Sequence, residues 1–300
     1  MKHSIPVIVV LLTMFLLAQF IGLFVLYKNI DVVKSSETGK TEFKDLPIGE
    51  RPPLEEKTSF VSLLIAVLIG TVLLLLLIKY KLLIIWKIWF LLAVVFALTI
   101  VLGTFVRLEV AFLAALIAGL WKLFRPNFWI HNLTELFLYG GLAVVLVPLF
   151  NLFSAVILLL VISGYDAYAV WKSKHMITMA KSQAKAKMFA GLLIPYKIKG
   201  MSAKGSSTGK KQLPAGAAKL RKVRTAVLGG GDIGFPLIFA GVLLKELGVW
   251  QSLVVPFGAA LGLCFLLWNG KKDRFYPAMP FISAGCFVAL GAVLLLGKVV

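Results

Sequence analysis

The sequence predicts an all-α membrane protein that crosses the bilayer several times. Of its 300 residues, 60% are hydrophobic and 15% are charged, and the mean hydropathy is +0.95. Soluble domains are about 45–50% apolar and about 25% charged. Apolar runs of about 20 residues, long enough to span a bilayer, occur nine times. They cover Ile5–Tyr27, Ser59–Ile78, Leu83–Leu102, Val106–Leu123, Trp129–Val147, Leu152–Trp171, Thr225–Leu244, Ser252–Trp268 and Pro277–Leu296.

The first run, Ile5–Tyr27, is too long for the apolar core of a signal peptide and has no small-residue cleavage site. We therefore expect a transmembrane helix there rather than a leader that is removed. The next segment, Lys28–Lys57, holds six Lys/Arg, seven Asp/Glu and three prolines. Such a nearly neutral, polar segment is expected to be a surface loop.

Short polar turns separate the next spans. Lys79–Lys81 divides the second span from the third, Arg125–Asn127 ends the fourth with a proline, and Pro148–Asn151 divides the fifth from the sixth. A basic turn, Asn269–Arg274, precedes the ninth span.

One connection is long and basic. Residues 172–224 hold fourteen Lys/Arg and no acid, and their centre, Gly200–Gly216, is rich in Gly, Ser and Lys. This composition predicts a flexible segment, although the apolar patch Met188–Tyr196 is expected to lie against the membrane or another helix. The predicted organisation is a bundle of six spans over residues 1–171, a flexible basic loop over 172–224, and three further spans over 225–300.

Basic residues set the predicted orientation, since cytoplasmic loops carry an excess of Lys and Arg. If residues 172–224 are cytoplasmic, the inside also holds Lys2, Lys79, Lys81, Lys122, Arg125, Lys271, Lys272 and Arg274, whereas the outside holds Arg107, Lys245 and Lys298. The N-terminus is then cytoplasmic and, with nine spans, the C-terminus is extracellular.

The net charge of +19 does not indicate nucleic-acid binding. The basic residues lie beside apolar spans, where they set topology and meet anionic lipid, and no aromatic stacking residues are interleaved with them. The three histidines and two cysteines do not have zinc-ligand spacing, so we expect no metal. Cys264 and Cys286 both lie in apolar runs, which does not favour a structural disulfide.

Two acids inside the spans require an explanation, because an acid at mid-membrane costs about 2.5–3.5 kcal/mol on insertion scales. Asp166 lies about five residues before the inner end of its span, and Asp232 about seven residues after the inner end of the next. At about 1.5 Å per residue both lie about 8–11 Å inside the cytoplasmic boundary. We expect them to face each other and to share a proton.

The other acids have simpler interpretations. Glu109 and Glu246 lie near outer boundaries and are expected to be interfacial. Glu135 lies four residues after His131, so it is expected to hydrogen-bond that ring or to line a cavity. Lys87 is expected to extend to the inner interface, with a salt bridge to Asp166 or Asp232 as the alternative.

Irregular backbone is predicted beside the two acids. Glycines Gly229, Gly230 and Gly231 precede Asp232, and they allow either close helix packing or the approach of another backbone. Tyr276-Pro277-Ala278-Met279-Pro280 opens the ninth span, and its prolines lack N–H groups. Irregular backbone at membrane depth is tolerated where it lines a cavity.

These three signatures together resemble the presenilin and signal peptide peptidase family of intramembrane aspartyl proteases. The family has Tyr-Asp in the sixth helix, Gly-x-Gly-Asp in the seventh and Pro-Ala-Leu opening the ninth. This chain has Tyr165-Asp166, Gly229-Gly230-Gly231-Asp232 and Pro277-Ala278-Met279, with Met279 in place of the usual leucine. The cytoplasmic placement of the long loop is similar to presenilin, and the short chain looks like an archaeal homologue.

The resemblance implies an aspartic endopeptidase of the cell membrane that cuts transmembrane helical proteins and needs no cofactor. Asp166 and Asp232 would be catalytic. Tyr165, the three glycines and Pro277–Met279 would shape the site. A cation channel lined by the same acids is the alternative. Its ion flux would survive an aspartyl-protease inhibitor. A prepilin-type peptidase also has a glycine before its aspartate, but the loop layout and the Pro277 motif argue against it.

Overall fold

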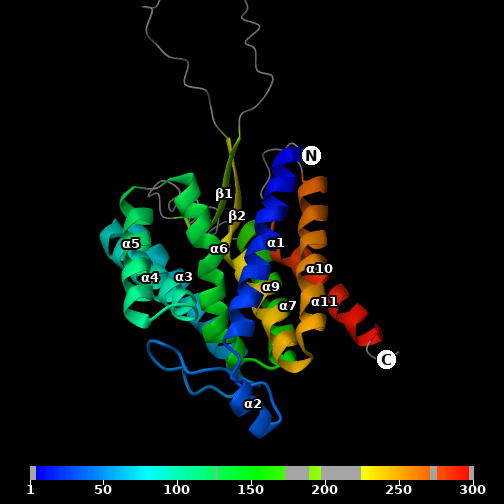
Figure 1. Ribbon diagram of the computed structural model, residues 1–300. Coiled ribbons are helices and arrows are strands. Elements are labelled where there is room, and N and C mark those ends of the chain that lie inside the picture. Colours follow the sequence, from blue (N-terminus) through cyan, green and yellow to red (C-terminus); the bar gives the residue numbers. More distant parts are fainter. Residues whose placement is uncertain (1–4, 126, 173–188, 197–223, 271–275, 297–300) are drawn as a thin grey trace, which may run out of the picture.

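The computed structural model describes residues 5–125, 127–172, 189–196, 224–270 and 276–296. Within these ranges the chain is mostly helical (Figure 1). The long helices are α1 (Ile5–Lys28), α3 (Ser59–Lys79), α4 (Leu83–Gly103), α5 (Leu108–Phe124), α6 (Phe128–Leu146), α7 (Leu152–Trp171), α9 (Gly230–Glu246), α10 (Val249–Asn269) and α11 (Met279–Leu296). Short elements are α2 (Val32–Thr38) and the 3-10 turn η1 (Val147–Leu149).

Seven of the described helices are long and apolar enough to cross a membrane, namely α1, α3, α4, α6, α7, α10 and α11. Helices α5 and α9 have 17 residues each and are shorter. The predicted helix bounds lie close to the observed ones, because the length of an apolar run is visible in the composition. The exceptions lie around the long basic loop.

Two predictions about that loop are wrong. Residues 191–196 form strand β1 (Gly191–Tyr196), whereas the sequence predicts a flexible 172–224 segment whose apolar patch, Met188–Tyr196, lies against the membrane or another helix. Strand β2 (Arg224–Gly229) occupies the place where a helix is predicted to begin at Thr225, so the predicted boundary at 224/225 falls inside a strand. The expectation for Gly200–Gly216 lies outside the described residues.

The two strands pair antiparallel, with Gly191 opposite Gly229 and Ile194 opposite Ala226. Successive side chains of a strand point to opposite faces. The hairpin therefore buries Leu192, Ile194, Ala226 and Leu228 while Val227 stays 51% exposed. Burial of this one face against the bundle fixes the pairing, since a slip by one residue would expose all four side chains.

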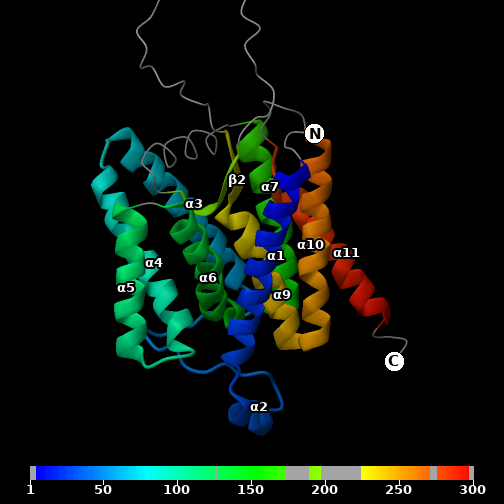
Figure 2. The same cartoon turned by 45° about the horizontal axis from the view of Figure 1, so that its top comes forward.

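Helix α9 lies inside the bundle, and most of its residues are buried. It packs against α1, α6, α7, α10 and α11, while α3, α4 and α5 lie to one side (Figures 1 and 2). Helix α9, which carries Asp232 in its first turn, therefore packs against helices from both ends of the sequence. The β-hairpin and the N-terminal end of α1 lie at one end of the bundle, and α2 lies at the other (Figure 1).

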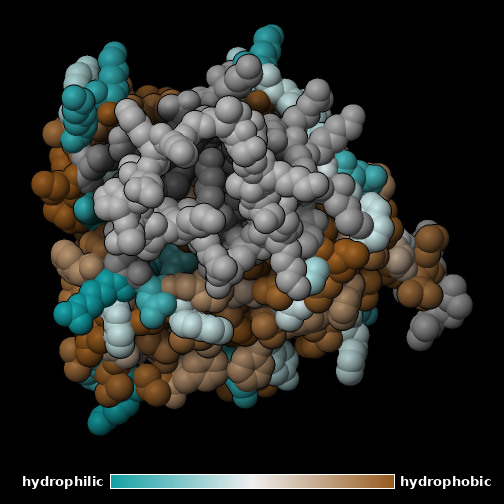
Figure 3. Space-filling view, turned by 90° about the horizontal axis from the view of Figure 1, so that it is seen from above, coloured by the Kyte–Doolittle hydropathy of each residue, from teal (hydrophilic) through white to brown (hydrophobic). Residues whose placement is uncertain are grey.

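The surface of the bundle is apolar on its flanks. Figure 3 looks onto the hairpin end and shows hydrophilic side chains around the rim and hydrophobic side chains over the neighbouring flank. Large apolar side chains such as Ile84, Trp129 and Leu261 are more than two-thirds exposed. Such a surface suits contact with lipid rather than water.

Candidate active site

The carboxylate of Asp166 lies in the last turns of α7 and is held by the start of α11. Its side chain is 4% exposed, and Oδ2 accepts a hydrogen bond from the backbone N–H of Met279 at 3.1 Å. The backbone of Ala278 also interacts with this carboxylate. The Pro277–Met279 segment predicted to lie beside the acids thus contacts one of them directly.

A hydrogen bond between side chains links α7 to α11 next to this contact. The Ser163 hydroxyl on α7 lies 2.8 Å from that of Ser283 on α11. Pro277 and Met279 are both buried, and α11 begins at Met279 rather than at Pro277, where the sequence predicts its start. The residues before Met279 are irregular, and main-chain donors are therefore free to bind a side chain.

Asp232 is the third residue of α9, and its carboxylate folds back over Gly229. A Cβ atom added to Gly229 would lie 3.2 Å from Oδ2 of Asp232, and the backbone of Gly229 hydrogen-bonds the carboxylate. A negative charge at this end of a helix is stabilised by the helix dipole. Gly229 thus gives the carboxylate both space and a hydrogen-bond donor.

The helices that carry the two aspartates pack against each other. Helices α7 and α9 pack against each other, α11 packs against both, and Asp166 and Asp232 are close enough for their charges to interact. Counting residues along the predicted spans puts the two acids at one depth, and that placement stays a prediction.

Other parts of the same chain contact the glycines before Asp232. A Cβ on Gly230 would lie 2.9 Å from the hydroxyl of Tyr139, and the N–H of Gly230 donates to the carbonyl of Ala190 at 3.1 Å. The approaching backbone at Gly230 is therefore that of the residue preceding β1. Gly231 is exposed, and its nearest neighbour would be the ring of Phe235 at 3.4 Å.

Tyr165 extends toward α3. Its hydroxyl donates to Oγ1 of Thr71 at 3.3 Å, and the side chain is half-buried. This contact ties α3, which is otherwise little buried, to the helix that carries Asp166.

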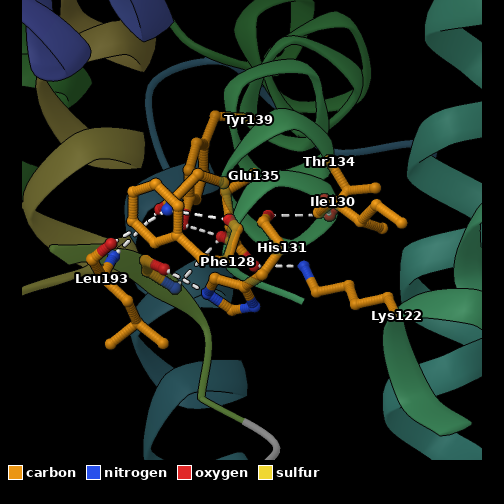
Figure 4. A network of polar contacts seen from close by, with 10 residues as sticks. Lys122, Phe128, Ile130, His131, Thr134, Glu135, Tyr139 and Leu193 are labelled. Atoms are coloured by element: carbon orange, nitrogen blue, oxygen red, sulfur yellow. Dashed lines mark hydrogen bonds and ion pairs between the residues drawn. The ribbon is translucent and has the colours of Figure 1, made fainter. Parts of the chain in front are cut away.

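Sequence reasoning missed a buried polar network on α6 (Figure 4). Glu135 accepts hydrogen bonds from Lys122 of α5, from the Tyr139 hydroxyl and from the Gly191 N–H of β1. The sequence predicts either a hydrogen bond from Glu135 to the His131 ring or a place for Glu135 at a cavity. The His131 ring instead lies 2.8 Å from the Gly191 carbonyl. We call this set, with Asn132, the α6 polar network.

The sequence also predicts the wrong environment for Lys122, which it places among the charges of the cytoplasmic side. Its side chain is 3% exposed and paired with Glu135, so it is not a free charge at the inner surface. The i, i+4 spacing of Glu135 and Tyr139 indicates a shared helix face. Nothing local, however, indicates partners from α5 and from a strand 56 residues away.

The two carboxylates suit acid–base chemistry on water, in which one takes a proton and the other donates one. Within the part of the chain that the structure describes, no group of three or more His, Cys, Asp or Glu is placed to hold a metal ion.

Comparisons with known proteins identify the family and the fold. A family model described as signal-peptide peptidase, presenilin aspartyl protease matches residues 14–297. The comparison with curated proteins finds no match. Two solved structures of a presenilin family intramembrane aspartate protease, in the P2 and C222 space groups, are similar in fold. Their TM-scores are 0.61 and 0.59 at 15% sequence identity, and the match covers 95% and 96% of this chain and 96% and 99% of those chains.

The family model covers nearly the whole sequence, and the fold agrees with it. This chain therefore belongs to the signal-peptide peptidase and presenilin family of aspartyl proteases, and it is a hydrolase with several membrane-spanning helices.

Proposed function

We propose that Asp166 and Asp232 are the catalytic dyad of an endopeptidase that hydrolyses peptide bonds within transmembrane helices. The observation that supports this proposal is the packing of α7, α9 and α11 against one another, with the carboxylate of Asp166 held by the start of α11 and its charge acting on Asp232. Family membership supplies the reaction class. Tyr165, Gly229, Gly230, Gly231, Pro277, Ala278 and Met279 shape the site around the dyad.

The proposed chemistry needs one ionised and one protonated aspartate. The ionised carboxylate takes a proton from a water molecule, which attacks the scissile carbonyl. The protonated carboxyl polarises that carbonyl and then helps to protonate the leaving amine. Both carboxylates act as acids and bases, so no covalent enzyme intermediate forms.

The proposed topology has nine spans, with α5 and α9 crossing the bilayer beside the seven longer helices. Family membership and the similarity of fold to a presenilin family protease support it. The N-terminal end of α1 lies at the hairpin end of the bundle, where the basic 172–224 segment begins and ends (Figure 1). With that end cytoplasmic, the N-terminus is cytoplasmic and the C-terminus extracellular.

A substrate helix must unwind before water can reach its backbone, because its amides are hydrogen-bonded internally. An unwound segment can then bind by strand addition. Strand addition needs an exposed main-chain edge on the enzyme. Either the Pro277–Pro280 segment or a strand from the long loop would supply this edge. The hydrogen bond from Met279 to Asp166 occupies the first of these, which favours the second.

Within the residues that the structure describes, β2 pairs with no strand other than β1. Side chains of α6 bind the N–H and C=O groups of Gly191 and Leu193, so these groups point away from β2. In an antiparallel pair, the opposite residues Val227 and Gly229 must then point their main-chain groups away from β1. A substrate strand added along this edge of β2 would arrive at Gly229 and the Asp232 carboxylate.

The test is cleavage of a single-span substrate in liposomes by the wild type, Asp166→Ala and Asp232→Ala, with the product peptides identified by mass spectrometry. We expect both variants to be inactive while their thermal unfolding and elution volume in detergent match the wild type. An aspartyl-protease transition-state inhibitor should also abolish cleavage. Product formation by either variant would refute the dyad.

A further inference from the structure

The α6 polar network contains a charge pair in the interior of the bundle. The side chains of Lys122 and Glu135 are 3% and 0% exposed. Removing two charges from water costs more than their attraction returns unless further hydrogen bonds satisfy them. Both oxygens of Glu135 are used: Oε1 accepts from Lys122, and Oε2 accepts from the Tyr139 hydroxyl and from the Gly191 N–H.

The two contacts of Oε2 lead to the same place on α9. The Tyr139 hydroxyl lies against Gly230, where an added Cβ would be 2.9 Å away. On the other side, Gly191 follows Ala190, whose carbonyl accepts the N–H of Gly230 at 3.1 Å. Gly230, two residues before Asp232, is therefore held on one side by Tyr139 and on the other by the start of β1. Both of these groups are bound by the carboxylate of Glu135.

We propose that Glu135, with its charge balanced by Lys122, is a positioning residue for the reaction. It holds Tyr139 and β1 on the two sides of Gly230 and thereby places the carboxylate of Asp232. The inference rests on the proposed catalytic role of Asp232. An ionised acceptor suits this task, because hydrogen bonds to a charged group are shorter and about twice as strong as neutral ones.

The contacts of Glu135 distinguish it from the neighbouring polar residues of α6. His131 and Asn132 bind the main chain of β1 at Gly191 and Leu193, so they hold the strand. Glu135 differs from both because it contacts the strand and Tyr139 together. Loss of Glu135 should therefore alter the dyad itself more than the affinity for substrate.

The experiment compares two double variants of the full-length protein. Lys122→Met with Glu135→Met removes both charges and the hydrogen-bond acceptor at position 135. Lys122→Met with Glu135→Gln removes the same charges but keeps an oxygen that can accept from Gly191. Both pairs avoid leaving a single buried charge unpaired, which would destabilise the fold. Thr99→Val, a buried hydroxyl on α4, serves as the control.

We expect kcat for a single-span substrate to fall about tenfold to a hundredfold in the Met–Met pair, since a displacement of about 1 Å has that effect. KM should stay within about threefold. The Met–Gln pair should recover most of the lost kcat, and Thr99→Val should match the wild type. A role in packing alone would lower both pairs equally, and that result, or an unchanged kcat in the Met–Met pair, overturns the proposal.

Tyr139→Phe keeps the charge pair and provides the test if the Met–Met pair does not fold. It removes only the hydroxyl that joins Glu135 to Gly230, and a kcat equal to that of the wild type would also overturn the proposal. Asp232→Ala is measured in parallel. If Asp232→Ala still cleaves, the proposed function itself fails; if it is inactive while the Met–Met pair and Tyr139→Phe keep full kcat, only the positioning role fails.

Discussion

The backbone N–H of Met279 donates a hydrogen bond to Oδ2 of Asp166 across 3.1 Å, from the first residue of α11 to α7. Pro277 and Pro280 flank this donor and have no N–H of their own. The contact is made by the main chain, so it does not depend on which side chain stands at position 279. The Pro-Ala-Met segment thus has a physical role that its residue types alone do not reveal.

Met279→Pro should lower kcat because it removes the N–H that Asp166 accepts. Hydrogen bonds to a charged group contribute about 1.5–3 kcal/mol, so we expect a loss of about tenfold to a hundredfold in substrate cleavage. Met279→Leu keeps the N–H and the apolar volume and should stay within about threefold of the wild type. Equal kcat values for the two variants would show that the hydrogen bond has no role in catalysis.

Gly230→Ala should reduce cleavage, because the new Cβ would lie 2.9 Å from the Tyr139 hydroxyl and 3.2 Å from its ring. Tyr139 is 3% exposed and cannot move without disturbing its neighbours. The matched control is Gly234→Ala, one turn along α9, where the nearest atom of the same ring would lie at 3.8 Å. Initial rates of cleavage should separate the two variants, and similar rates would contradict the crowding at Gly230.

The sequence predicts the helices better than the hairpin for a physical reason. The length and hydropathy of a membrane span are local properties, and seven of the described helices agree with them. The alternation of buried and exposed residues in β1 is hidden, because Leu192, Leu193 and Ile194 are all apolar. Its partner β2 lies beyond the long basic segment, so the pairing that fixes it is not local.

In the candidate site, too, local features could be predicted from the sequence and contacts between distant segments could not. Depth along two adjacent spans puts Asp166 and Asp232 at one level, and the structure places them within electrostatic reach. Their catalytic roles remain a prediction. The partners of Glu135 could not be found in this way, because Lys122 comes from another helix and Gly191 from an unpredicted strand.

Lys245→Met should destabilise the protein more than removal of the acid it pairs with. The Lys245 ammonium donates to Glu56 at 2.7 Å, and also to the carbonyls of Pro148 and Phe150 at 3.3 and 3.1 Å. Loss of the lysine leaves those carbonyls without their donor, and we expect about 1–3 kcal/mol from the free energy of unfolding. Glu56→Gln breaks a half-exposed pair and should cost about 0–1 kcal/mol. Chemical denaturation in detergent measures both, and a larger loss for Glu56→Gln would contradict this assignment.

Gly285→Ala should lower the free energy of unfolding by separating α10 from α11. The added Cβ would lie 2.0 Å from the carbonyl oxygen of Gly258, and main-chain atoms cannot rotate aside as a side chain can. Overpacking of this kind costs about 1–3 kcal/mol. Gly291→Ala is the control on the same helix, since its Cβ would meet nothing within 4 Å. Alanine is favoured over glycine in a helix by about 1 kcal/mol, so Gly291→Ala should leave stability unchanged or raise it slightly. Thermal unfolding in detergent should therefore lower the midpoint of Gly285→Ala and leave that of Gly291→Ala unchanged or slightly raised. Equal midpoints for the two variants would mean that the α10–α11 contact is looser than the structure indicates.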